Sequence, residues 1–140
     1  MLPLLARLSP NVALLIATLA VALIALELNR PGSILPGAAG LLLLLLAAAS
    51  LWERQPSELA TAGAIASIAL LLLQARRPLH LSVIAALTAL LIACFIRLIP
   101  RASTGRINAV TAVVCGTILG AGTTVLTRIA RRARQNKGLD

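Results

Sequence analysis

The side chains that could do chemistry are few and scattered in this sequence. It has one histidine, two cysteines and four acidic residues among 140 residues. His80 alone provides neither a metal triad nor a histidine relay, and it follows Arg76 and Arg77, where an interfacial surface residue is expected. Cys94 and Cys115 fall in apolar stretches, where a thiol behaves as a small hydrophobic side chain. We therefore expect no catalytic residue, no cofactor-binding residue and no metal ligand.

One polar stretch stands out, running from Glu27 to Gly40. A carboxylate at the end of an apolar run is costly unless it is paired or lies at the membrane interface. Arg30 follows Glu27 by three residues, so a local ion pair at head-group level would account for both charges. Alternatively, the stretch is a fixed polar corner that another subunit or domain recognises. The candidate recognition residues are Glu27, Arg30, Pro31, Gly32, Gly37 and Gly40.

Long uncharged windows separate these polar groups, and the elements that these windows form must position them. The chain is 59% hydrophobic and 12% charged, with a mean hydropathy of +0.97, too few charges to cover the surface of a soluble domain. The windows run from Leu8 to Leu26, Pro31 to Trp52, Leu59 to Ala75, Pro78 to Ile96 and Ile107 to Thr127. Helices of these lengths cross a hydrocarbon core of roughly 30 Å.

The fold class expected is all-α: a polytopic transmembrane helical bundle with about five spans. Strands are excluded because the windows are solid Leu, Ala, Ile and Val without alternation. The expected spans are 11–28, 34–51, 59–74, 79–96 and 107–128 within a membrane domain of residues 1–134, followed by a basic cytoplasmic tail over 129–140. Gly116 and Gly120 form a GxxxG pair in the last span, which favours helix packing inside the bundle over a dimer interface.

The net charge of +9 is explained by membrane orientation rather than by nucleic acid, because the basic residues lie in short connections and in the tail. In a five-span bundle one side collects Arg30, Arg76, Arg77, Arg128, Arg131, Arg132, Arg134 and Lys137. The other side collects Arg7, Arg54, Arg97, Arg101 and Arg106. The side with eight basic residues is predicted to be cytoplasmic, which leaves the N-terminus outside and the C-terminus inside a bacterial inner membrane.

The corner also carries a resemblance. Pro10-Asn11, a span ending in Leu-Glu-Leu, the run from Arg30 to Gly40 and a following Leu run together resemble the membrane region of the NfeD family. The likeness is close over residues 10–51 and rests on helix order and the basic tail beyond. In that family the membrane bundle typically lies between a Clp-like serine protease domain and a small OB domain, and we expect a stand-alone module without either.

The resemblance implies a role in binding. The leading hypothesis is a non-catalytic scaffold or assembly subunit for a membrane-associated partner, in an assembly of the NfeD and stomatin type. The implied partners are the lipid bilayer, a stomatin-like or protease partner protein and a second copy of the chain, with no nucleic acid and no cofactor. The alternative is a small transporter or channel subunit, although no span carries the mid-membrane charge that an ion path usually needs.

Overall fold

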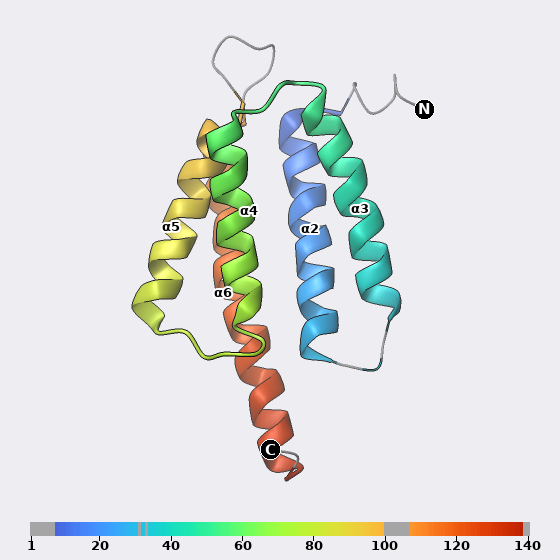
Figure 1. Cartoon of the computed structure of the whole chain (residues 1–140), viewed down its shortest axis with the longest axis vertical. Coiled ribbons are helices and arrows are strands. Elements are labelled where there is room, and N and C mark those ends of the chain that lie inside the picture. Colours follow the sequence, from blue (N-terminus) through green and yellow to red (C-terminus); the bar gives the residue numbers. More distant parts are fainter. Residues whose placement is uncertain (1–7, 31, 33, 100–106, 139–140) are drawn as a thin grey trace.

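A computed structural model describes residues 8–30, 32, 34–99 and 107–138 of the chain. Within these residues every regular element is a helix, and no strand occurs. The helices are α2 (Pro10–Asn29), α3 (Leu35–Trp52), α4 (Glu58–Leu73), α5 (Leu81–Arg97) and α6 (Ala109–Asn136). The all-α helical bundle expected from the sequence is confirmed (Figure 1).

The ends of α2 and α6 follow from ordinary capping chemistry. Ser9 precedes α2 and its hydroxyl accepts a hydrogen bond from Val12 N at 3.3 Å, as an N-cap does. α6 continues to Asn136, eight residues past the expected end of the last span at Arg128, because nothing between these positions breaks a helix. It stops just before Gly138, whose φ of 65° is the left-handed conformation common after a helix end.

The helices form two antiparallel hairpins, α2–α3 and α4–α5, with α6 packed against both (Figure 1). α6 contacts α2 in the first hairpin and mainly α5 in the second. Among the described helices, the Cα atoms of α3 come within 8 Å of those of α2 and of no other helix. The α2–α3 hairpin therefore depends on α2 for its attachment to the rest of the bundle.

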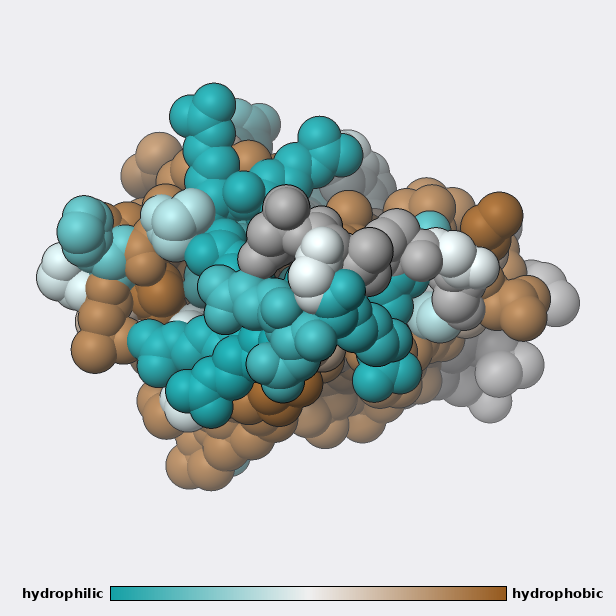
Figure 2. Space-filling model, turned by 90° about the horizontal axis from the view of Figure 1, so that it is seen from below, coloured by the Kyte–Doolittle hydropathy of each residue, from teal (hydrophilic) through white to brown (hydrophobic). Residues whose placement is uncertain are grey.

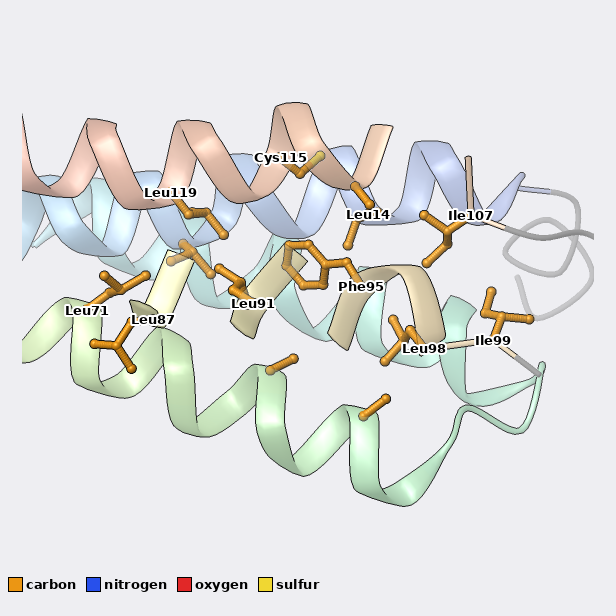
Figure 3. Packing of buried hydrophobic residues seen from close by; sticks show 14 of the residues in the cluster. Leu14, Leu71, Leu87, Leu91, Phe95, Leu98, Ile99, Ile107, Cys115 and Leu119 are labelled. Atoms are coloured by element: carbon orange, nitrogen blue, oxygen red, sulfur yellow. The ribbon is translucent and has the colours of Figure 1, made fainter. Parts of the chain in front are cut away.

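The core is a thin apolar seam where α2, α4, α5 and α6 meet. Leu91 and Phe95 of α5 lie between α4 and α6, close to Leu119 (Figure 3). Most leucines of α3, by contrast, point outward, and Leu42 and Leu45 are 65% and 67% exposed. So much exposed apolar surface requires lipid as the solvent, and the backbone satisfies itself inside the helices as a bilayer demands.

Three of the five helices, α2, α3 and α6, are long and apolar enough to cross a membrane. α4 and α5 are apolar but have only 16 and 17 residues, or roughly 24 to 26 Å at 1.5 Å per residue. Both run alongside the longer helices (Figure 1). Lengths slightly below the hydrocarbon thickness are accommodated by local thinning of the bilayer.

The helix order separates the basic residues between the two ends of the bundle. All eight residues of the larger predicted group are described and lie at the end where α6 terminates, which has a hydrophilic centre surrounded by apolar surface (Figure 2). Of the smaller group, Arg54 and Arg97 lie at the opposite end, and Arg7, Arg101 and Arg106 lie outside the described residues.

We expect opposite locations for reporters fused at the two chain ends. A reporter after Asp140 should report cytoplasm and one before Leu2 should report the outside, because the more basic side is retained in the cytoplasm. Both positions lie outside the described residues. Paired alkaline phosphatase and fluorescent protein fusions would measure this. The same location for both reporters would contradict the five-span arrangement.

Candidate functional site

Glu27 and Gly37 are brought together where α2 ends and α3 begins. Gly37 is buried in the first turn of α3, and a Cβ atom added to it would overlap the Glu27 carboxylate. The half-buried carboxylate thus lies beside a helix N-terminus, whose partial positive charge stabilises an anion. Ile34, the N-cap residue of α3, makes no side-chain capping hydrogen bond.

The local ion pair between Glu27 and Arg30 is not formed: within the described residues no carboxylate oxygen lies within 4 Å of the Arg30 guanidinium. Arg30 is exposed, and its backbone N–H donates to Leu26 O and Glu27 O at 3.0 Å, which closes the last turn of α2. The Glu27 carboxylate lies against the first turn of α3 instead. From the sequence, only Arg30, which is close to Glu27 in the chain, was considered as its charge partner.

The remaining corner residues differ in how closely other parts of the chain surround them. Gly40 is buried against α2, where an added Cβ atom would lie 2.7 Å from Ala20 O and 2.9 Å from Ile24 Cγ1. Gly32 has a φ of 121°, which glycine adopts without strain, and nothing lies near it. Pro31 lies outside the described residues. Gly37 and Gly40 therefore allow α3 to approach α2 closely, a packing role in addition to the predicted recognition role.

A second polar cluster was missed by the sequence analysis. Arg131 Nη2 donates to Gln74 O at 2.9 Å, and Arg134 Nη2 donates to Asn29 O at 3.3 Å. These two arginines of α6 therefore bind the carbonyl ends of α4 and α2, where helix dipoles favour a cation. The sequence feature that could have indicated this cluster is a side-chain amide at the end of an apolar helix: Asn29 at the end of α2 and Gln74 at the end of α4.

Gln74 is the most deeply placed polar residue of this cluster, with 2% of its surface exposed. The Thr124 hydroxyl of α6 lies 3.2 Å from Gln74 Oε1 and also donates to Gly120 O at 2.7 Å. Gln74 Nε2 has no hydrogen-bond partner among the described residues. The cluster fixes α4 against α6 at the basic end of the bundle.

Two cavities follow the seam between α2 and α4. The one at the basic end has a volume of about 520 Å³, and its lining includes Glu27 from α2 and Arg76 from the α4–α5 connection. The other lies further along the seam, has a volume of about 330 Å³ and is almost wholly apolar, with Val21 and Ile68 in its lining. Glu27 also lines a smaller cavity of about 250 Å³ beside α3.

The other residues singled out in the sequence lie apart from these cavities. His80 is exposed and precedes α5, Cys94 is half-buried and Cys115 is buried. Across the described ranges no group of three His, Cys, Asp or Glu side chains could hold a metal ion. Gly116 and Gly120 are buried in α6, facing Ile92 and Thr88 of α5 in the same bundle.

The comparisons with known proteins agree with this arrangement. A family model described as the NfeD integral membrane domain matches residues 11–129. No curated protein and no solved structure matches the chain. The match covers all of α2 to α5 except Pro10, and most of α6, well beyond the corner that carried the resemblance. The chain is an integral membrane protein and belongs to the NfeD integral membrane domain family.

Proposed function

We propose that this chain is a non-catalytic scaffold or assembly subunit for a membrane-associated partner protein of the stomatin type. The observation that supports this best is the position of Glu27. Its carboxylate is half-buried, lies over Gly37 and lines two cavities at the basic end of the bundle. A carboxylate placed beside apolar helices is costly and is by default a candidate functional group, and we assign it to recognition.

The α2–α3 hairpin offers the surface around that carboxylate. α3 faces α2 through the small buried residues Gly37 and Gly40, while Leu42 and Leu45 are largely exposed. Lipid can cover the outward leucines, so apolar exposure alone is no sign of a partner. A polar corner at a fixed position, at the end of a hairpin with exposed leucines, gives a partner both an apolar surface and a point of recognition.

A catalytic role has little support in the same region. Glu27 is the only acidic residue described at the basic end, and His80 is exposed in the α4–α5 connection. A nucleophile, its base and an orienting group must lie within hydrogen-bond reach of one another. The hydrogen bonds of this end, between arginines and backbone carbonyls, serve helix ends instead.

Glu27→Gln is expected to reduce recovery of the partner while leaving insertion and expression unchanged. The substitution keeps the shape of the side chain and removes the charge that the partner would contact. The measurement is quantitative mass spectrometry of proteins that co-purify with the tagged chain from native membranes in mild detergent. We expect a loss of roughly tenfold, since a hydrogen bond to a charged group contributes about 1.5 to 3 kcal/mol.

Glu53→Gln is the matched control, because Glu53 is exposed at the other end of α3 and undergoes the same change of charge. This control should retain the partner at the level of the unmodified chain. Equal recovery with both variants would leave the corner as a structural turn and contradict the recognition role of Glu27.

A further inference from the structure

We propose that the cavity at the basic end of the α2–α4 seam binds the head group of a phospholipid that carries both a phosphate and a primary ammonium, as phosphatidylethanolamine does. The phosphate would bind Arg76 and the ammonium would bind Glu27. One acyl chain would continue along the seam. This inference goes beyond the proposed scaffold function and does not depend on it.

The first step of the argument is the pair of opposite charges in one cavity. Glu27 comes from α2 and Arg76 from the segment after α4, and both line the space of about 520 Å³. Within the described residues the two side chains do not approach to 4 Å, so they form no ion pair with each other. A ligand with one positive and one negative group matches both walls at once.

The second step concerns the apolar residues that follow this cavity along α4. Leu72 and Leu73 line the cavity together with Leu28 of α2. On α4 the lining continues at helical spacing through Ile68 and Ala64 into the apolar cavity of about 330 Å³. A soluble phosphate would leave these apolar residues without a contact, whereas a phospholipid presents a head group followed by a hydrocarbon chain.

The third step separates a zwitterionic lipid from an anionic one. Arg131, Arg132 and Lys137 make the surrounding face basic, and such a face attracts anionic lipids without a defined site (Figure 2). Inside the cavity Glu27 repels a head group that carries only negative charge. Glu27 also favours a primary ammonium over choline, because a quaternary ammonium has no N–H to donate to the carboxylate.

The test is lipid retention by the purified full chain, measured by native mass spectrometry. Detergent micelles would contain equal amounts of phosphatidylethanolamine, phosphatidylglycerol and phosphatidylcholine with identical acyl chains. We expect the unmodified chain to retain phosphatidylethanolamine roughly tenfold over each of the other two lipids, in line with one additional charge-assisted hydrogen bond.

The variants separate the two charges. Glu27→Gln should lower the preference for phosphatidylethanolamine over phosphatidylcholine severalfold, because the amide oxygen still accepts a hydrogen bond but carries no charge. Arg76→Gln should lower retention of all three lipids. Glu53→Gln and Arg97→Gln change exposed charges at the opposite end and should leave the ratios unchanged. Leu73→Trp keeps both charges and fills the cavity, so it should lower retention of all three lipids even if Glu27→Gln fails to fold.

Two results would overturn the proposal. One is retention of phosphatidylglycerol equal to or above that of phosphatidylethanolamine by the unmodified chain, which would indicate general attraction to the basic face. The other is an unchanged ratio of phosphatidylethanolamine to phosphatidylcholine in a folded Glu27→Gln variant. Because no partner protein is present in this measurement, its outcome is independent of the test of the scaffold function.

Discussion

Gly40→Ala is expected to destabilise the bundle by about 1 to 3 kcal/mol, the usual range for overpacking. The added methyl group would lie 2.7 Å from Ala20 O, a backbone atom of α2 that no rotamer change can move away. α3 must therefore shift away from α2. Since the Cα atoms of α3 come within 8 Å of no other described helix, this shift loosens its attachment to the bundle.

Gly122→Ala is the matched control for this prediction, because it adds the same methyl group to a helix where nothing lies within 4 Å of the new atom. That control should be neutral or stabilising, as alanine favours a helix over glycine by up to about 1 kcal/mol. Unfolding in detergent, followed by circular dichroism, compares the two variants. Equal stability would show that α2 and α3 do not approach as closely as Gly40 implies.

The helices were predictable because hydropathy alone marks them. Each expected span coincides with a helix, and most ends differ by one or two residues from the expected ones. The exception is α6, which continues through the basic segment to Asn136. Charge ends the apolar window there without ending the helix, since arginine is a good helix former. A hydropathy window therefore measures the apolar part of α6 and not its length.

The contacts of the corner residues were not predictable from the sequence. One interpretation paired Glu27 with Arg30, three residues away, whereas the Glu27 carboxylate lies against Gly37, ten residues away and across a turn. Helical spacing gives neighbours within one helix only. How two helices face each other depends on their packing, which the glycines permit but do not specify by themselves.

The contacts among Gln74, Asn29, Arg131 and Arg134 could not be predicted from the sequence for the same reason. Arg134 and Asn29 are 105 residues apart, and Arg131 and Gln74 are 57 apart. In the sequence analysis these arginines were used only to predict the orientation of the chain in the membrane. In the folded chain they also bind the carbonyl ends of two helices, so the charges expected to set the topology hold the basic end together as well.

Gly120→Leu is expected to destabilise the bundle more than any other single change considered, by more than the range of about 1 to 3 kcal/mol that is typical of overpacking. Even a Cβ atom at Gly120 would overlap Thr88 Oγ1, and it would lie 2.8 Å from Thr88 Cγ2 and 3.0 Å from Thr88 Cβ. The Thr88 side chain cannot turn aside easily, because it is β-branched and its hydroxyl donates to Ile84 O at 2.8 Å. A leucine must therefore push α5 away from α6.

Gly122→Leu provides the control on the same helix, since Gly122 is exposed and lies two residues further along. It adds the same side chain where nothing lies within 4 Å of the new Cβ atom, and it should leave thermal stability in detergent within the range of a surface change, about 0.5 kcal/mol. A second test uses Gly120→Ala alone and together with Thr88→Ala. The double variant should recover part of the stability that Gly120→Ala loses, because Thr88→Ala removes two of the three atoms that the new methyl group meets. If Gly120→Leu unfolds at the same temperature as Gly122→Leu, or if the two alanine substitutions are simply additive, then α5 and α6 do not pack through Gly120.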